Sequence, residues 1–337
     1  MARLSKAFRL MRRMVRLQAS VFKLPPRPRR VVARPLADPP PPADRVTELR
    51  RFGSNPGALR MFVYAPPQLV EAAPLVVVLH GCGQDAASFA THSGWIALAR
   101  RQGFPLVLPE QVHANHRNRC FNWYRPGDVG QAGESLSIRQ MIALAARRFG
   151  SDRRRIFVVG LSAGGAMAGA MLAAYPALFA GGAIVAGMPV GAASGSLMAL
   201  HRMHRADPLG SRAALINAVQ AASPVRKGGR FPRISIWQGS ADRTVDPANA
   251  ELLAAQWSGV HGLELLPASD TEPAPGLRRR AWRGRSGERV EVWTLAELAH
   301  GYPIDPVVDE GRPGPWVVEA GVSATRRIAG FWGLGDG

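Results

Sequence analysis

The sequence is poor in cysteine, with Cys82 and Cys120 as its only two among 337 residues. That number excludes a small disulfide-stapled scaffold and a structural zinc site with four thiolates. The two cysteines can form one disulfide or remain free thiols, and their positions in the sequence do not decide between these alternatives. The sequence also lacks an apolar run of transmembrane length, a cluster of metal ligands and a glycine-rich loop of the phosphate-binding kind. We therefore expect neither a metal nor a cofactor.

Acidic residues are also scarce, with 24 Asp and Glu against 43 Lys and Arg, and the formal net charge is +19. Such an excess raises the question of a nucleic-acid partner. Residues 1–34 hold eleven of the basic residues and no acid, so residues 35–337 carry only +8. Nearly all the basic residues are arginines, and no nucleic-acid-binding motif accompanies them. We therefore expect no nucleic-acid partner.

The basic N-terminal stretch has its own pattern. Residues 1–24 place apolar and basic residues at helical spacing, which predicts a basic amphipathic arm. This stretch lacks the unbroken apolar segment and the cleavage site of a secretory signal. Residues 1–34 can anchor the chain to an anionic membrane or a hydrophobic granule, or they can form a loosely ordered basic tail. Residues 25–44, with four successive prolines, indicate an extended linker. A folded domain is expected over residues 45–337.

Apolar segments that alternate with helical ones fill this domain, and 47% of the chain is hydrophobic, enough for a large core. The alternation predicts an α/β fold with a mainly parallel sheet and helices on both faces. Segments 46–52 and 59–65 predict an antiparallel hairpin at the N-terminal edge. Helices are expected between the later strands, among them 92–102 and an insertion at 196–222. The buried strands are predicted at 75–79, 104–108, 156–159, 183–186, 234–238 and, as the last strand, 290–295.

One strand-turn-helix segment carries a catalytic motif. The strand at 156–159 runs into Gly160-Leu-Ser-Ala-Gly164, which has the G-x-S-x-G pattern, and a helical segment follows. The two glycines permit the sharp turn that leaves the hydroxyl of Ser162 exposed above the sheet. The helix N-terminus directs its amides towards the place where an oxyanion would form. We interpret Ser162 as the nucleophile of a hydrolase, with a plain tight turn as the alternative.

Two later strand ends supply the partners that such a serine needs. Asp242 follows the strand before the last, and His300 follows the last strand. Because ligands collect at the carboxyl ends of parallel strands, we expect Ser162, Asp242 and His300 to converge there. This is also the nucleophile, acid and base order of the α/β-hydrolases. Asp246 is the alternative acid, although its place before Pro247 also suits a helix cap.

The oxyanion donors are expected at two backbone amides. The turn His80-Gly-Cys-Gly83 follows the first buried strand and can present the amide of Cys82. The second donor would be the amide of Ala163, just after the nucleophile. We interpret His80 as a residue that orders its turn, with a catalytic role as the alternative. Surface roles are expected for five further histidines, which are His113, His116, His201, His204 and His261.

Six stretches of this chain also match the pattern of a known family. With them, the sequence from about Leu59 to the C-terminus resembles the poly(3-hydroxybutyrate) depolymerase-like esterases. The resemblance implies an α/β-hydrolase catalytic domain at 45–337 with Ser162, Asp242 and His300 as its triad. The stretches are Leu79-His-Gly-Cys-Gly-Gln-Asp85, Cys120-Phe-Asn-Trp-Tyr124, Gly160-Leu-Ser-Ala-Gly-Gly-Ala-Met167, Gly239-Ser-Ala-Asp242, His300-Gly-Tyr-Pro-Ile-Asp305 and Gly321-Val-Ser-Ala-Thr-Arg-Arg-Ile-Ala329.

The resemblance implies more about the surroundings of the site. It implies that Cys82 bridges to Cys120, which would pin the oxyanion turn to the loop of Asn122 and Trp123. It assigns both of these residues to substrate binding, with core packing as the alternative for Trp123. Secreted polymer-degrading members carry a cleavable signal and a polymer-binding module, and neither is visible here. Without a standard signal peptide, a cytoplasmic or granule-associated protein is one alternative. The resemblance and a disulfide would favour an extracellular protein, so the compartment stays open.

These features predict a serine esterase that hydrolyses carboxylic esters through an acyl-enzyme. The expected substrate is a hydroxyalkanoate oligomer or polymer, or a small acyl ester. An acetyl- or feruloyl-type carbohydrate esterase is the alternative with the same fold and triad. The alternative of another class is a non-catalytic protein bound to a granule or membrane surface through residues 1–34.

Overall fold

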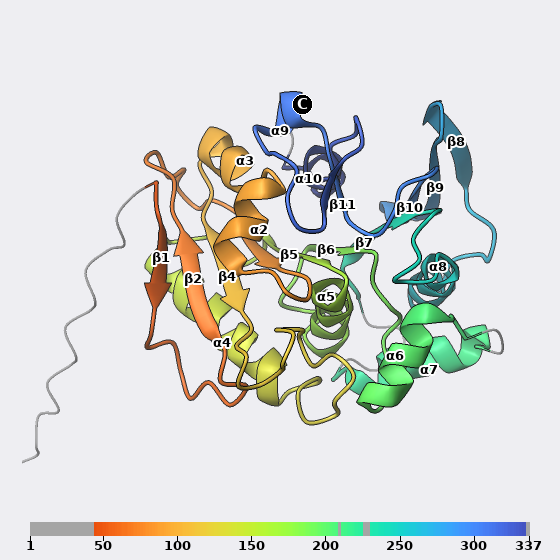
Figure 1. Ribbon diagram of the computed structural model, residues 1–337, viewed down its shortest axis with the longest axis horizontal. Helices are drawn as coiled ribbons and strands as arrows, with labels where there is room; N and C mark the ends of the chain where they lie inside the picture. The colour runs from red at the N-terminus through yellow and green to blue at the C-terminus, as the bar shows by residue number, and fades with distance from the viewer. Residues whose placement is uncertain (1–43, 208–209, 225–229, 335–337) are drawn as a thin grey trace, which may run out of the picture. The chain divides into compact units, whose positions relative to one another are not determined.

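The computed structural model describes residues 44–207, 210–224 and 230–334. The predicted basic arm at 1–24 and the linker up to residue 43 lie outside the described residues, so both stay predictions. The domain boundary at residue 45 stays a prediction as well. The described part of the chain is built around one large β-sheet (Figure 1).

The sheet has ten strands within the described ranges, in the order β1-β2-β4-β3-β5-β6-β7-β10-β9-β8. Its central strands pair in parallel, as predicted. Strands such as Leu-Val-Val-Val-Leu at 75–79 are buried along their whole length because helices cover both faces. The parallel strands are β4 (Leu106–Glu110), β3 (Leu75–Leu79), β5 (Ile156–Leu161), β6 (Gly181–Val185), β7 (Arg233–Gly239) and β10 (Gly287–Leu295).

Both edges of the sheet are antiparallel. At the N-terminal edge, β1 (Val46–Leu49) and β2 (Arg60–Tyr64) form the predicted hairpin, and β2 also pairs antiparallel with β4. At the other edge, β9 (Leu277–Gly284) and β8 (Ser269–Ala274) extend the sheet antiparallel from β10. The sequence does not predict this second edge, because β8 and β9 are rich in charged residues and show no clean apolar alternation.

The prediction that 290–295 is the last strand is wrong, since two short strands follow it. β11 (Tyr302–Ile304) and β12 (Val317–Glu319) pair in parallel as a separate two-stranded sheet. Each has three residues, too few for a periodic pattern to identify. The short helix α9 (Pro306–Asp309) lies between them.

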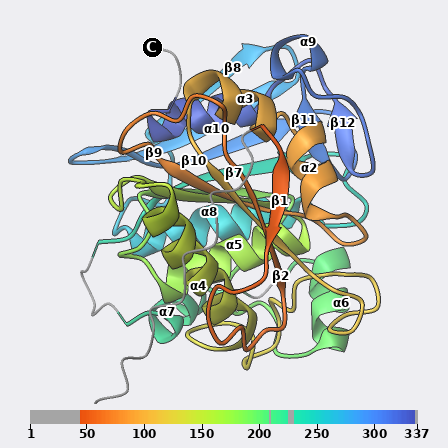
Figure 2. The ribbon, with the colours of Figure 1, turned by 90° about the vertical axis from the view of Figure 1, so that its left-hand side faces the viewer.

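The helices divide between the two faces of the sheet (Figure 2). The core on one face takes apolar side chains from α4, α5, α7 and α8, and the other core takes them from α2, α3 and α10. The bounds are α4 (Gly133–Arg148), α5 (Ala163–Ala174), α7 (Arg212–Ala222), α8 (Ala248–Val260), α2 (Ala86–His92), α3 (Trp95–Gln102) and α10 (Ala324–Trp332). The mainly parallel sheet with helices on both faces confirms the predicted fold class.

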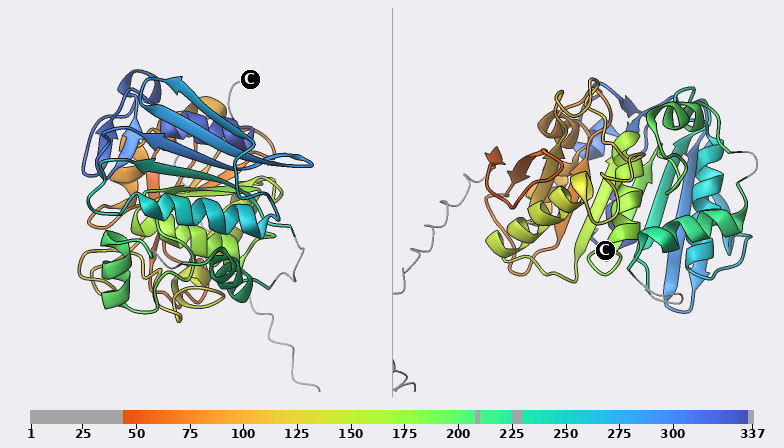
Figure 3. Two further views of the ribbon diagram at one scale, coloured as in Figure 1. Left: turned by 90° about the vertical axis from the view of Figure 1, so that its right-hand side faces the viewer. Right: turned by 90° about the horizontal axis from the view of Figure 1, so that it is seen from below.

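Two predicted helices are divided in the structure. The helix expected at 92–102 is interrupted after its first residue: His92 ends α2, and the remainder forms α3 from Trp95 onward. The N-cap of α2, Asp85, accepts a hydrogen bond from the backbone N–H of Ser88. The insertion expected at 196–222 consists of α6 (Ser196–His204) and α7. Figure 3 shows α6 beside the long loop that follows β4. Within the described ranges, no helix combines the length and apolar character that crossing a bilayer requires.

Candidate active site

Ser162 occupies the sharp turn between β5 and α5. Its backbone has φ 57° and ψ −118°, a conformation that residues with a Cβ rarely adopt. A Cβ on Gly160 would come within 2.1 Å of the carbonyl oxygen of Gly164, and one on Gly164 within 2.4 Å of the carbonyl oxygen of His80. No side chain fits at either position, so both residues must be glycine. The N–H of Ser162 donates to the carbonyl of Val185 at 2.8 Å, which holds the turn against β6.

His300 and Asp242 are joined by a hydrogen bond although they stand 58 residues apart in the chain. The Nδ1 of His300 lies 2.7 Å from the Oδ2 of Asp242, and both residues are buried. The carboxylate also accepts the backbone N–H groups of Thr244 and Val245, both at 2.8 Å, and the side-chain amide of Gln238 at 3.0 Å. Because the carboxylate accepts, Nδ1 carries the proton and Nε2 keeps its lone pair.

The surroundings keep Asp242 ionised. Burial acts to raise the pKa of this carboxyl. The hydrogen bond from His300, the charge of the imidazole and the two backbone amides outweigh burial, so the pKa lies below its usual value of 3.8. At neutral pH the carboxylate is therefore charged and can orient the ring of His300.

Ser162 and His300 line the same cavity, which has a volume of about 360 Å³. The two expected oxyanion donors, the residues Cys82 and Ala163, line it as well. Within the described part of the chain, neither of their backbone N–H groups has a hydrogen-bond acceptor. Both amides are thus available to a ligand in the cavity. In the described ranges, no group of three or more His, Cys, Asp and Glu residues gathers as a metal site would need.

The turn that carries Cys82 is fastened to the loop between β4 and α4. A disulfide joins Cys82 to Cys120, with their Cα atoms 4.3 Å apart. The N–H of Gly83 donates to the carbonyl of Asn118 at 2.7 Å, and the guanidinium of Arg119 donates to the carbonyl of Gly83 at 3.0 Å. These contacts hold the amide of Cys82 in place at the cavity wall.

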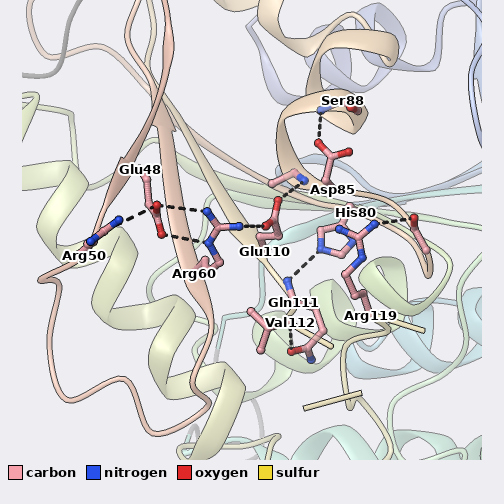
Figure 4. A network of polar contacts seen from close by, with 12 residues as sticks. Glu48, Arg50, Arg60, His80, Asp85, Ser88, Glu110, Gln111, Val112 and Arg119 are labelled. Atoms are coloured by element: carbon pink, nitrogen blue, oxygen red, sulfur yellow. Dashed lines mark hydrogen bonds and ion pairs between the residues drawn. The ribbon is translucent and has the colours of Figure 1, made fainter. Parts of the chain in front are cut away.

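His80 is buried next to this turn, and Figure 4 shows its contact with the backbone of Gln111. Its Nε2 accepts the backbone N–H of Gln111 at 3.1 Å, so its Nδ1 carries the proton and donates to the carbonyl of Gly81 at 2.8 Å. Burial lowers the pKa of His80 to about 4, which keeps the ring neutral. Both ring nitrogens are occupied by backbone groups, which agrees with a role in ordering the turn.

The two residues expected to bind substrate have different surroundings. Trp123 lines the cavity and also packs against two hydrophobic clusters, a position that is compatible with both roles considered for it. Asn122 is buried outside the cavity lining, and its backbone and side-chain amides both donate to the carboxylate of Glu134. Asp246, the alternative acid, accepts the backbone N–H groups of Ala248 in α8 and of Ala206. It serves as a cap and makes no contact with His300.

Several cavity residues were not predicted from the sequence. His116 was expected at the surface, but it is half-buried and lines the cavity, because its loop folds back over the oxyanion turn. The ring of Trp316 packs edge-on against His300, with centroids 5.6 Å apart. Leu200 and Met203 reach the cavity from α6. The one sequence signal for this part of the cavity was the presence of apolar residues within the arginine- and histidine-rich segment of α6.

Known proteins are similar to this chain in sequence and in fold. The family model described as Esterase PHB depolymerase matches residues 59–274. Poly(3-hydroxyalkanoate) depolymerase C of Paucimonas lemoignei is 37% identical over 295 residues, which cover 86% of this chain and 70% of that protein. Feruloyl esterase B of Talaromyces funiculosus is 27% identical over 276 residues, 78% of this chain and 75% of that protein.

A solved structure agrees with this assignment at the level of the fold. The acetyl xylan esterase from Aspergillus awamori superposes with a TM-score of 0.69 at 24% sequence identity, covering 76% of this chain and 94% of that one. The predicted α/β-hydrolase-type fold is thereby confirmed, and the family model together with the 37% identical depolymerase confirms the predicted ester hydrolase. The chain belongs to the Esterase PHB depolymerase family and is a serine esterase with an α/β-hydrolase fold.

Proposed function

We propose that Ser162 is the nucleophile of this esterase, His300 its general base and Asp242 the carboxylate that holds the imidazole. The observation that carries this proposal is the 2.7 Å hydrogen bond between His300 and Asp242 beside a cavity that Ser162 also lines. With its Nδ1 proton committed to Asp242, His300 can accept the proton of Ser162 only at Nε2. The strained backbone of Ser162 supports the same role, because such strain gathers at functional sites.

The reaction then follows in two stages. The Oγ of Ser162 attacks the ester carbonyl while His300 takes its proton, and the negative charge moves to the carbonyl oxygen. The amides of Cys82 and Ala163 stabilise that oxyanion, and each such donor typically contributes about 100- to 1,000-fold in rate. Collapse of the intermediate breaks the bond to the alcohol, which receives the proton from His300. Water, activated by the same imidazole, then releases the acid.

The favoured substrate is a hydroxyalkanoate ester. A relative that is 37% identical is a poly(3-hydroxyalkanoate) depolymerase. Trp123, Leu200 and Met203 give the cavity a largely apolar wall, which suits the short aliphatic side chains of such units. A carbohydrate ester is the second candidate, because feruloyl esterase B of Talaromyces funiculosus is also similar over most of the chain. Initial rates on a 3-hydroxybutyrate trimer, methyl ferulate and acetylated xylan distinguish the two.

The test of the nucleophile is a pair of serine variants. Ser162→Ala should abolish hydrolysis of p-nitrophenyl butyrate and also the mass increase that a fluorophosphonate probe produces in the intact protein. Ser286→Ala, in the exposed turn between β9 and β10, should retain both. Circular dichroism and thermal melting establish that the variants are folded. Residual labelling or turnover in folded Ser162→Ala would contradict the assignment.

We further propose that residues 1–34 bind the enzyme to an anionic or hydrophobic surface. Their eleven basic residues without any acid support this proposal. Co-sedimentation with anionic vesicles should decline on deletion of residues 1–34, while turnover of p-nitrophenyl butyrate persists. Equal sedimentation of both forms would contradict the proposal.

A further inference from the structure

His116 occupies a fixed place in the cavity wall. It lies on the loop between β4 and α4 and shares the cavity lining with Ser162 and His300. The same loop is joined to the oxyanion turn through the disulfide of Cys120 and the carbonyl of Asn118. The imidazole of His116 is therefore held in a set position relative to the groups proposed for catalysis.

The hydrogen bonds of His116 determine which of its nitrogens carries the proton. Its Nδ1 lies 3.1 Å from the backbone nitrogen of Asn118 and 3.4 Å from that of Cys120. Both groups are N–H donors, so Nδ1 must accept and the single proton of the neutral ring is on Nε2. Burial, with a smaller contribution from the charge of Arg125, lowers the pKa of His116 and keeps the ring neutral. Within the described ranges, Nε2 has no protein acceptor.

The rest of this wall is largely apolar. Trp123, Leu200, Met203 and Trp316 line the cavity around His116. An N–H group in such a setting loses hydration when a substrate enters, so a substrate that offers it an acceptor is favoured over one that does not. A few placed polar groups in an apolar pocket commonly set specificity in this way.

We propose that the Nε2–H of His116 donates a hydrogen bond to the carbonyl oxygen of the ester unit next to the scissile one. The proposal rests on the esterase mechanism and the polyester substrate proposed above. A hydroxyalkanoate chain repeats a carbonyl in every unit, so it always offers this second acceptor. A simple acyl ester such as p-nitrophenyl butyrate has no second carbonyl. His116 thus selects substrates with at least two ester units.

Two substitutions separate this role from support of the loop. In His116→Asn the side-chain oxygen can take the place of Nδ1 and accept the amides of Asn118 and Cys120, but no donor reaches the position of Nε2. In His116→Gln the amide nitrogen can take the place of Nε2. The control is His113→Asn, an exposed histidine of the same loop outside the cavity lining.

The measured quantity is the ratio of kcat/KM for a 3-hydroxybutyrate trimer to kcat/KM for p-nitrophenyl butyrate. A neutral hydrogen bond contributes about 0.5–1.5 kcal/mol, so His116→Asn should lower the ratio about 2- to 13-fold, mainly through KM for the trimer. His116→Gln should restore part of it, and His113→Asn should leave it as in the wild type. An unchanged ratio in His116→Asn, or an equal fall on both substrates, would overturn the proposal. A wild-type protein inactive on both substrates would instead refute the esterase mechanism itself.

Discussion

Asn122 donates two hydrogen bonds to Glu134, from its backbone nitrogen at 2.8 Å and from its side-chain nitrogen at 2.6 Å. Glu134 lies in the first turn of α4 and is fully buried, and it also accepts the side-chain amide of Gln111 at 2.5 Å. The backbone of Gln111 in turn donates to His80 next to the oxyanion turn. One buried carboxylate therefore connects α4, the loop after β4 and the turn of Cys82.

The buried carboxyl group of Glu134 predicts that the stability of the fold depends on pH. Burial raises the pKa of Glu134 to about 7, above its usual 4.5, despite the hydrogen bonds from Asn122 and Gln111. Between these two pH values the folded protein binds a proton that the unfolded chain has already lost, so stability falls as the pH rises. Relative to Glu134→Gln, the free energy of unfolding of the wild type should decrease from pH 4.5 to 7 and then level off. Urea denaturation of both proteins across this pH range measures the difference in their free energies of unfolding. A difference that stays constant or rises with pH would contradict the prediction.

Gly164→Ala should destabilise the fold. The added Cβ would lie 2.4 Å from the backbone carbonyl oxygens of Leu79 and His80, which cannot move without shifting β3. We expect a loss of about 3 kcal/mol from this overpacking. The matched control is Gly330→Ala in α10, where a Cβ would meet nothing within 4 Å and should stabilise by about 0.5–1 kcal/mol. Chemical denaturation of both variants should therefore give shifts of opposite sign.

Removing the disulfide should affect stability and catalysis together. Cys82→Ser opens a loop of 38 residues, and the entropy of closing a loop of that length corresponds to about 4 kcal/mol. It also loosens the turn that presents the amide of Cys82, so kcat should fall as well. Thermal melting and turnover of p-nitrophenyl butyrate test this, with Cys120→Ser expected to match Cys82→Ser in both. Full activity in either variant would show that the turn keeps its position without the bridge.

Asp242→Asn should impair catalysis, whereas Asp246→Asn should impair only stability. The first exchanges a carboxylate acceptor for an amide next to His300, disturbs the tautomer of the ring and should lower kcat about 10,000-fold. The second keeps one side-chain oxygen for the N–H of Ala248 but loses the oxygen that accepts the N–H of Ala206, which should cost about 1 kcal/mol of stability with kcat retained. Steady-state kinetics and urea denaturation of the two variants test this contrast. A larger loss of kcat in Asp246→Asn would reverse the assignment of the acid.

The elements that the sequence predicted well are those with a strong local pattern. Buried strands such as β3 and β5 are continuous apolar runs, and the glycines around Ser162 mark its turn whatever surrounds it. β8 and β9 lack such a pattern. β9 is held by hydrogen bonding to β10, and β8 by hydrogen bonding to β9 and by ion pairs such as Arg278 with Asp270, which depend on partners brought together by folding. Their strand character was therefore not visible in the sequence.

By itself, the sequence determined the fold class and the residue types available for ester hydrolysis, because hydrophobic periodicity and the spacing of glycines act over a few neighbouring residues. Only the tertiary structure decided how these residues meet. In the structure Asn122 contacts Glu134 and does not line the cavity, whereas His116 and Trp316 do line it. Asp246 caps a helix. Each outcome depends on contacts between segments far apart in the chain, and no local pattern encodes the distance or direction of such a contact.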